Sequence, residues 1–344
     1  MGATPDERLA TFCRERGVDG VVIRRRGNMS WATGGADFHC DTASTFGIAA
    51  LVWTPHVKTV HTDTIEAPRL RDEEPLDGWE VKASPWWGRD AELANIESSG
   101  RYASDAVEDI LTDLRSPLSQ EEIARAEPLG RDTAEVVERI MREEVKPGIS
   151  EHHLGGALAG RLRDRGIQAH VVLVAADERI SMYRHPIPTA KRIERLAMAA
   201  VCAQRNGLIV SVTRLVHFGP LSADLLTRHD AVTRVDSALH DATRVGARWC
   251  DALARGVDEY ARRGFGDEWK KHHQGGPMGY ECRDFKATQT EGRAVKPDQL
   301  VGWNPSITGT KSEDTILTAA TGPRVITRTG NWPERNARPD ILVR

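Results

Sequence analysis

Hydrophobic and polar positions in the first third of the chain alternate between a helical and an extended period. Polar turns that contain proline or glycine separate the segments. The expected elements are a helix over Pro5–Arg16 ending at Gly17, a strand over Gly20–Ile23, a hairpin of Ala49–Trp53 and Lys58–His61, and a helix over Ser104–Leu114 capped by Ser104. This alternation predicts an α/β domain with a sheet of its own.

The pattern changes after Ser116-Pro117. Ser119 and Glu122 have the spacing of a capping box, which predicts the start of a long amphipathic helix that reaches about Glu144. Ser150 then opens a helix that ends at Gly166. The remaining elements are strands over 171–175, 208–215, 300–303 and 315–319, and a pair of long helices within 225–263. The predicted fold class is therefore α+β, in two domains of residues 1–117 and 118–344.

Composition supports a globular protein and excludes several other classes. The 344 residues are 40% hydrophobic and 28% charged with a net charge of −3, which fits two domains and gives no footprint for nucleic acid. The N-terminus lacks an apolar signal core, and no apolar run is long enough to cross a membrane. Five cysteines without a C-x-x-C pair indicate reduced thiols in the cytoplasm. High arginine use with few lysines suggests a bacterial genome rich in GC.

Several segments resemble the superfamily of creatinase, aminopeptidase P and prolidase, family M24. They are Asn28-Met-Ser-Trp31-Ala-Thr-Gly-Gly35, Arg184-His185-Pro186, Gly207 with Thr213-Arg214 and Gly219, His272-x-x-Gly275, and Ser312-Glu313-Asp314-Thr315. The resemblance covers essentially the whole chain. It implies a creatinase-like N-terminal domain followed by a catalytic domain with the pita-bread fold. It also implies a homodimer in which the N-terminal domain of one subunit closes the active site of its partner.

The metal ligands of that family are mostly replaced. The metallopeptidases hold two ions with Asp, Asp, His, Glu and Glu, and the matching positions here are Ala200, Ser211, His272, Asn304 and Glu313. Two hard cations need several anionic oxygen ligands, which one imidazole and one carboxylate do not supply. No Asp or Glu lies between Arg195 and Ala223, so a shifted alignment does not restore the pair. We therefore expect neither a metal ion nor another cofactor.

The resemblance also implies the residues of a metal-free reaction. Creatinase has the same fold and hydrolyses a C–N bond with a histidine as acid and base, and His185 stands at that position. His272 is the second acid–base candidate. Arg283 follows His272 by eleven residues, as does the creatinase arginine that binds the substrate carboxylate. Glu313, the third catalytic candidate, either orients His272 or binds a cationic nitrogen. Its alternative role is a structural pair with Arg214 or Lys311.

Neutral polar and aromatic positions complete the predicted pocket. Those expected to bind substrate are Ser211, Thr213, Tyr280, Trp303 and Asn304. Thr213 and Asn304 stand where creatinase has glutamates, so the guanidinium of creatine is not the predicted substrate. If His272 and His273 lie on a strand, their side chains point in opposite directions. Cys202 and Cys282 lie near the replaced positions and are weaker candidates for a nucleophile.

Three functions remain open from the sequence. The leading hypothesis is a metal-independent hydrolase or lyase that acts on a C–N bond of a small carboxylate-bearing metabolite. The first alternative is a Xaa-Pro aminopeptidase or prolidase with a reduced metal site, in which the histidines and Glu313 hold a single ion. The second alternative is a catalytically inactive pita-bread scaffold that binds peptides or proteins.

Overall fold

The computed structural model describes residues 3–99 and 101–344 and divides the chain into two compact units. The first unit comprises the residues up to Glu122 together with Asn206–Leu208, and the second comprises Ile123–Arg205 and Ile209–Arg344. The domain boundary predicted between residues 117 and 118 lies just before this division. Among the residues described, no helix combines the length and the apolar character that crossing a membrane requires.

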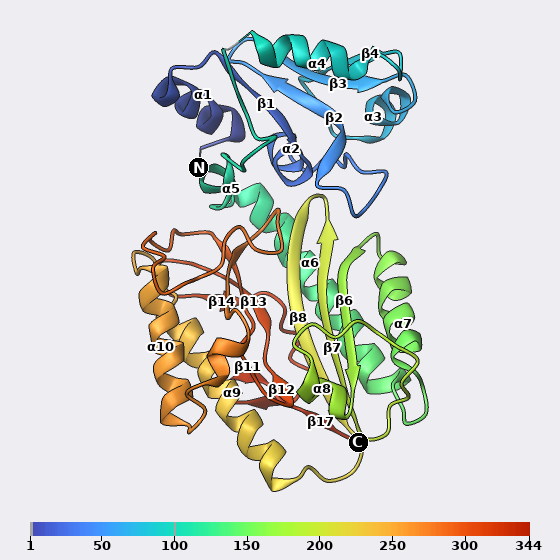
Figure 1. The fold of residues 1–344 in the computed structure, drawn as a ribbon, viewed down its shortest axis with the longest axis vertical. Helices are drawn as coiled ribbons and strands as arrows, with labels where there is room; N and C mark the ends of the chain where they lie inside the picture. The colour runs from blue at the N-terminus through green and yellow to red at the C-terminus, as the bar shows by residue number, and fades with distance from the viewer. Residues whose placement is uncertain (1–2, 100) are drawn as a thin grey trace. The chain divides into compact units, whose positions relative to one another are not determined.

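The first unit is built on a five-stranded sheet in the order β4-β3-β2-β1-β5 (Figure 1). Its elements are α1 (Pro5–Arg16), β1 (Gly20–Arg25), α2 (Arg26–Ala32), β2 (Phe46–Trp53), β3 (Lys58–Asp63), α3 (Ala67–Glu73), β4 (Glu80–Ser84), α4 (Arg89–Ser98), β5 (Tyr102–Ser104) and α5 (Thr112–Arg115). The predicted first helix and hairpin are confirmed. Thr4 and Glu7 form a capping box at the start of α1, and Gly17 ends the helix in the left-handed conformation.

The predicted helix over Ser104–Leu114 is wrong. Ser104 ends the short strand β5, which pairs in parallel with β1. The buried carboxylate of Asp105 accepts hydrogen bonds from the backbone N–H groups of Arg24 and Arg25 at 2.6 and 3.1 Å. These bonds tie the segment to the end of β1, so a helix cannot start there. Asn28 lies in α2 and donates to the same carboxylate at 2.8 Å.

The second unit carries two four-stranded sheets, in the orders β17-β8-β7-β6 and β14-β13-β10-β9 (Figure 1). Its helices are α6 (Gln120–Arg139) with a π-helical extension (Ile140–Glu144), α7 (Glu151–Arg163), α8 (Glu178–Met182), α9 (Ala223–Ala242), α10 (Trp249–Arg262) and the 3₁₀ turn η2 (Glu268–Lys271). Its main strands are β6 (Gln168–Ala176), β7 (Leu196–Arg205), β8 (Leu208–His217), β9 (Gly275–Met278), β10 (Leu300–Trp303) and β13 (Asp314–Leu317). Short strands complete it: β11 (Ser306–Ile307), β12 (Thr310–Lys311), β14 (Arg324–Val325), β15 (Glu334–Arg335), β16 (Arg338–Pro339) and β17 (Leu342–Val343).

Most predicted elements of this unit are present. The capping box at Ser119 forms, with Glu122 accepting from the Ser119 N–H at 2.7 Å. The long helix pair is α9 and α10, which pack over β10 and β13 around the buried Trp249 and Trp303. Strand β7 is absent from the prediction. Its run of alanines has low strand propensity, and its pairing along the whole of β6 is what makes it extended.

The two sheets meet where β8 runs beside the residues that lead into β13. Thr213 and Glu313 form an isolated antiparallel bridge, and the Thr213 N–H donates to the Glu313 carbonyl at 3.1 Å. Next to it, the Ser211 N–H donates to the Thr315 hydroxyl at 2.7 Å. The side chain of Glu313 is therefore fixed at the junction of the sheets.

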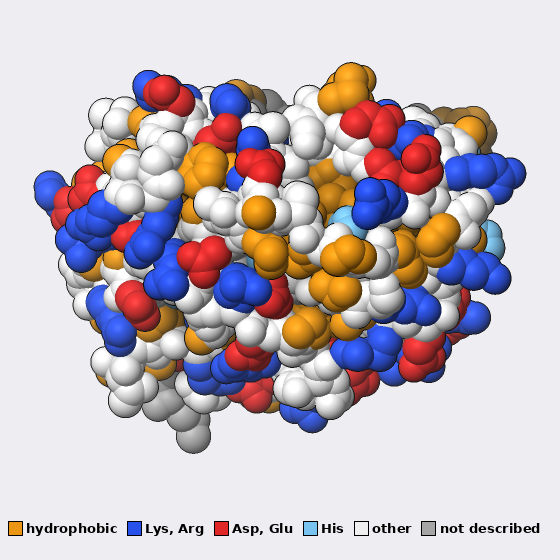
Figure 2. Space-filling view, turned by 90° about the horizontal axis from the view of Figure 1, so that it is seen from below, with side chains coloured by type: hydrophobic (Ala, Val, Ile, Leu, Met, Phe, Trp, Pro, Cys, Tyr) orange, Lys and Arg blue, Asp and Glu red, His pale blue; other side chains and the backbone are white. Residues whose placement is uncertain are grey.

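The face shown in Figure 2 carries no large area of one charge. On the face shown in Figure 2, acidic and basic side chains alternate, and apolar side chains gather between them. The near-zero net charge of the sequence is thus distributed and not separated into patches.

His229 is a buried histidine away from the pocket. It lies on α9 and contacts the Thr310 hydroxyl at 2.7 Å, the Pro339 carbonyl at 3.2 Å and the Asp340 carboxylate at 3.4 Å. Burial lowers the pKa of His229 to about 4, against the opposing effect of Asp340. The neutral ring therefore joins α9 to β12 and to the end of the chain.

This pKa predicts an acid-sensitive stability. In the unfolded chain the ring takes a proton near pH 6.5, and in the folded chain only near pH 4, so the unfolded state gains protons first. Acidification from pH 6.5 to 4 should remove up to about 3 kcal/mol of unfolding free energy through this residue. We expect His229→Gln to flatten the pH dependence measured by urea denaturation, relative to the exposed control His153→Gln. Parallel pH profiles of the two variants would contradict the assignment.

Candidate active site

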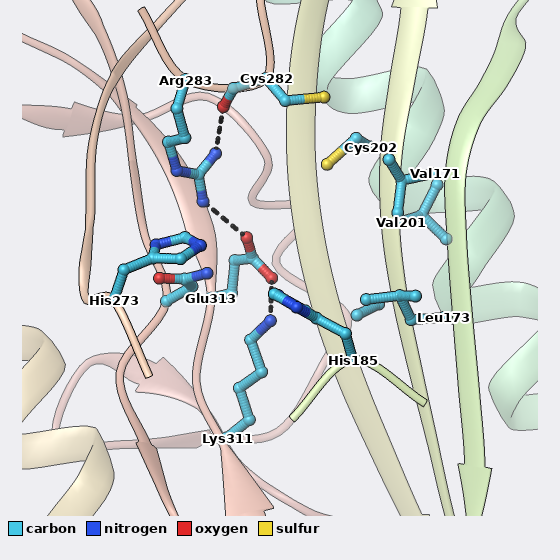
Figure 3. A pocket seen from close by; sticks show the side chains of 12 residues that line it. Val171, Leu173, His185, Val201, Cys202, His273, Cys282, Arg283, Lys311 and Glu313 are labelled. Carbon is cyan, nitrogen blue, oxygen red and sulfur yellow. Dashed lines mark hydrogen bonds and ion pairs between the residues drawn. The ribbon is translucent and has the colours of Figure 1, made fainter. Parts of the chain in front are cut away.

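A cavity of about 290 Å³ in the second unit gathers four of the nine predicted site residues, His185, Arg283, Asn304 and Glu313 (Figure 3). The side chains that line it are Val171, Leu173, His185, Ala200, Val201, Cys202, His273, Cys282, Arg283, Asn304, Lys311 and Glu313. One wall, from β6 and β7, is apolar. The opposite wall carries the imidazoles and the charged groups (Figure 3). A pocket of this size fits a ligand of about two amino acids.

Glu313 is the electrostatic centre of the charged wall. Its carboxylate lies 3.0 Å from the Lys311 ammonium and 3.2 Å from the Arg283 guanidinium, and it accepts from the Thr213 hydroxyl at 2.6 Å (Figure 3). Burial acts to raise the pKa of Glu313, but the charges of Lys311 and Arg283 outweigh it and lower the pKa to about 2. Lys311 and Arg214 are the two structural partners considered for Glu313. The Glu313 side chain pairs with Lys311, whereas the Arg214 side chain pairs with Glu138 and Asp314.

Three histidines form a cluster beside this wall. The Nε2 atoms of His185 and His272 are 3.0 Å apart, and the ring of His273 stacks on that of His272 with centroids 4.5 Å apart. The expectation that His273 points away from His272 is wrong. The pair precedes β9 in an irregular segment, so the alternation of a strand does not apply.

Glycines permit this irregular approach. Gly275 and Gly276 follow with φ of +120° and +153° and pair with Trp303 and Gly302 on β10. A Cβ atom on Gly275 would lie 2.1 Å from the Gly302 carbonyl oxygen, so only glycine fits.

Glu268 joins the two segments that carry the histidine cluster, which are the turn with His185 and the segment with His272 and His273. It lies in η2, just before His272, and accepts from Arg184, the neighbour of His185, at 2.8 Å. It also accepts from the backbone N–H of Thr308 at 2.9 Å and from Lys271 at 2.7 Å. The turn that carries His185 is thereby fastened to the segment that carries His272 and His273.

The imidazoles are neutral at physiological pH. Burial, together with the nearby Lys311, lowers the pKa of His272 to about 2, and burial with Arg283 lowers the pKa of His273 to about 4. The pKa of His185 is lowered in the same way, by burial and Lys311. Neutral rings accept a proton or a metal ion, and they act as acids only after they have accepted a proton.

The residues at the family's metal positions do not fit a pair of ions. Ala200 offers no ligand atom, and the hydroxyl of Ser211 faces the sulfur of Met278 at 3.8 Å. Glu313, the one carboxylate among the five positions, is already neutralised by Lys311 and Arg283. The positive charges of the Lys311 ammonium and the Arg283 guanidinium beside Glu313 repel further cations, and this repulsion adds to the missing ligands.

The remaining predicted residues are only partly brought to the cavity. Asn304 lines it, and its buried side-chain oxygen has no hydrogen-bond partner among the residues described. Thr213 does not line the cavity, and its hydroxyl donates to the Glu313 carboxylate. Trp303 instead donates to the Thr243 hydroxyl at 2.8 Å within the helix-side core, and Tyr280 accepts from Arg125 at 3.3 Å. Trp303, Tyr280 and Ser211 therefore support the site and do not line it.

A pair of thiols in the wall is a feature that the sequence analysis did not find. Cys202 on β7 and Cys282 after β9 both line the cavity, and their sulfur atoms point toward each other (Figure 3). The interaction between the two thiols lowers the pKa of Cys202, and together with burial raises that of Cys282. Eighty residues separate the two in the chain, so no local pattern could have paired them.

The buried charges around Glu313 predict a large effect on stability. Glu313→Gln leaves the buried Lys311 and the partly buried Arg283 without a counter-charge, which should cost about 3 kcal/mol of unfolding free energy. The double variant Glu313→Gln/Lys311→Met removes one of these charges and should recover part of the loss. Denaturant unfolding measures both, with Lys270→Met at an exposed ion pair as the control that changes little. Losses as small for Glu313→Gln as for the control would contradict the account.

Comparisons with known proteins agree with this architecture. The sequence profile of metallopeptidase family M24 matches residues 129–320. The Xaa-Pro dipeptidase of Pyrococcus horikoshii is 22% identical over 351 residues, which span 94% of this chain and 96% of that protein. The solved prolidase from Pyrococcus horikoshii OT3 superposes with a TM-score of 0.80 at 18% identity, over 97% of this chain and 99% of that one.

The same fold also occurs in a protein of another kind. The N-terminal domain of the FACT complex subunit SPT16 from chickpea (Cicer arietinum) matches with a TM-score of 0.72 at 13% identity, over 95% of this chain and 97% of that one. The predicted pita-bread fold with its N-terminal domain is confirmed. The profile match covers more than half of the chain and includes the positions around the cavity, and the chain therefore belongs to metallopeptidase family M24.

Proposed function

We propose that this chain is a hydrolase that cleaves the C–N bond of a small, dipeptide-sized substrate with a free carboxylate, at a site too reduced for two metal ions. Its likeness to Xaa-Pro dipeptidases favours this peptidase reading over the metal-independent hydrolase or lyase that led the sequence analysis. The observation that carries the proposal is the placement of Arg283 and Lys311 around one buried carboxylate in the pocket wall.

The charge of the pocket selects an anion. Lys311 and Arg283 together carry two positive charges against the one negative charge of Glu313, and among the residues described no other acidic side chain lines the cavity. The three imidazoles add no charge near neutral pH. A carboxylate is thus attracted to this wall, and the planar donors of Arg283 match its two oxygens.

The rest of the pocket suits an amide with an apolar side chain. The unpartnered oxygen of Asn304 accepts a hydrogen bond from a substrate N–H, which removes the cost of leaving it buried and unpaired. Val171, Leu173 and Ala200 form an apolar surface on the other side. By the sequence match, Ala200 stands where the family has an acidic metal ligand. Its methyl group makes this part of the pocket apolar, which favours an apolar substrate group such as a proline ring.

The histidines supply the proton transfers of hydrolysis. A neutral imidazole takes a proton from water as the water attacks the amide carbon, and the imidazolium then returns the proton to the leaving amine. His185 is the proposed base, and the 3.0 Å contact between its Nε2 and that of His272 orients its ring; the low pKa of His272 makes that second ring a poor proton acceptor. The positive charges of Lys311 and Arg283 stabilise negative charge that develops on the amide oxygen.

A panel of Xaa-Pro dipeptides, other dipeptides and N-acyl amino acids tests the proposal, each paired with its C-terminal amide. We expect the free acid to be preferred by roughly 10- to 100-fold in kcat/KM, since hydrogen bonds to charged groups contribute about 1.5–3 kcal/mol. Product formation is followed by mass spectrometry.

Variants of Arg283, the residue proposed to bind the substrate carboxylate, make this test more specific. Arg283→Gln should abolish the preference for the acid, and Arg283→Lys should retain part of it because the charge remains without the fork of donors. The exposed Arg248→Gln is the control and should keep the full preference. Because the readout is a ratio of two substrates, partial loss of folded protein does not change it. An unaltered ratio in Arg283→Gln would contradict the role of this residue.

A binding scaffold is the second candidate. The loss of metal ligands and the likeness to the SPT16 domain favour it. Saturable binding of dipeptide acids without turnover of any member of the panel would support the scaffold and refute the hydrolase. The homodimer implied by the resemblance stays a prediction.

A further inference from the structure

We propose that His185, His272 and His273 form a mononuclear site for a late transition-metal ion such as Zn²⁺, Co²⁺ or Ni²⁺. The ligand set differs from the family's aspartates and glutamates, since only His272 stands at one of those positions. The inference goes beyond the proposed function, because the ion can be held whether or not a substrate is hydrolysed.

The first argument is geometric. One ring nitrogen from each of the three histidines lies within 4.8 Å of the others, and the Nε2 atoms of His185 and His272 are already 3.0 Å apart. Three nitrogens bound tetrahedrally at about 2.0–2.1 Å from one ion are roughly 3.3 Å apart. One pair therefore has nearly the spacing of bound ligands, and small ring rotations bring in His273.

The second argument is the absence of competing partners. The Nδ1 atoms of His272 and His273 are buried and have no hydrogen-bond partner among the residues described. The three rings contact one another, whereas the only carboxylate of the cavity, Glu313, is bound by Lys311, Arg283 and Thr213. An ion held between the Nε2 atoms of His185 and His272 can take the unpartnered Nδ1 of His273 as its third ligand, and the Nδ1 of His272 stays outside the ion's reach.

The surroundings also determine which ions fit. Imidazole nitrogen suits Zn²⁺, Co²⁺, Ni²⁺ and Cu²⁺, whereas Mg²⁺, Ca²⁺ and Mn²⁺ prefer carboxylate and carbonyl oxygen. The positive charges of Lys311 and Arg283 oppose every cation, so only ions that form strong bonds to nitrogen remain bound. Three protein ligands leave a fourth position open toward the cavity, as in catalytic zinc sites.

The arrangement is held in place from outside the cluster. His185 is followed by Pro186 in its turn, and Glu268 joins its other neighbour, Arg184, to the segment before His272. Ligands held by such contacts lose little freedom when an ion binds, because their positions are set before binding.

Titration of the metal-free, full-length chain with Co²⁺ tests the site directly. Nitrogen-bound Co²⁺ absorbs visible light, and we expect an absorption band that saturates at one ion per chain and is displaced by Zn²⁺. Mn²⁺ and Mg²⁺ should neither displace the ion nor bind in isothermal calorimetry. The absence of a saturable band would overturn the inference.

Variants separate this site from other modes of binding. His273→Gln should weaken Co²⁺ binding by on the order of 10-fold or more and shift the band, because one of three ligands is lost. The exposed His153→Gln should bind as the unaltered chain does. Circular dichroism confirms that each variant is folded. If His273→Gln binds as tightly as the control, the three-histidine site is wrong, whichever way His272→Gln behaves.

The outcomes remain separable from those of the proposed function. Ion binding without turnover of any dipeptide contradicts the hydrolase and leaves the metal site intact. Turnover by a chain that binds no Co²⁺ or Zn²⁺ contradicts the metal site and leaves the hydrolase intact.

Discussion

A carboxylate that is 3% exposed requires compensation, and that of Glu313 fixes the organisation of the whole pocket. Three groups supply the compensation: the ammonium of Lys311, the guanidinium of Arg283 and the hydroxyl of Thr213. Each comes from a different part of the second unit. The carboxylate thereby joins β8, the loop after β9 and the strand β12, and the backbone bridge between Thr213 and Glu313 holds the two sheets at the same point.

The same interaction reverses the electrostatics of the family's metal site. In a dinuclear centre, carboxylates surround cations that are free to exchange. Here cations of the chain itself surround the one remaining carboxylate, and they cannot leave. Anions are attracted to the wall, the neighbouring histidines are kept neutral, and hard metal ions lose their ligands. Burial is the main cause of the low pKa values of His272 and His273, and the charges of Lys311 and Arg283 add to it. The other two consequences rest on the sequence match that sets Ala200, Ser211 and Asn304 against the family's acidic ligands.

The sequence was sufficient to find the residues that family motifs place in register. His185, Arg283, Asn304 and Glu313 all line the cavity, because the segments that carry them belong to a fold recognisable over the whole chain. Local reasoning failed where tertiary contacts decide the conformation. Asp105 binds the end of β1 and prevents a helix at Ser104, and the close approach of Gly275 to β10 brings His273 to the same side as His272. The directions of Trp303 and Tyr280 depend on partners more than 50 residues away, Thr243 and Arg125, that no pattern identifies.

The pocket thus separates two kinds of chemistry that the family's metal centre combines. A dinuclear site uses its ions both to attract the substrate's negative charge and to activate water. Under the proposed function and the proposed ion site, the attraction belongs to Arg283 and Lys311, while proton transfer or ion binding belongs to the imidazoles of His185, His272 and His273. Glu268 connects the turn of His185 to the segment of the other two through contacts that do not include Glu313. Changes in one group can therefore alter substrate affinity while leaving the other group's geometry in place.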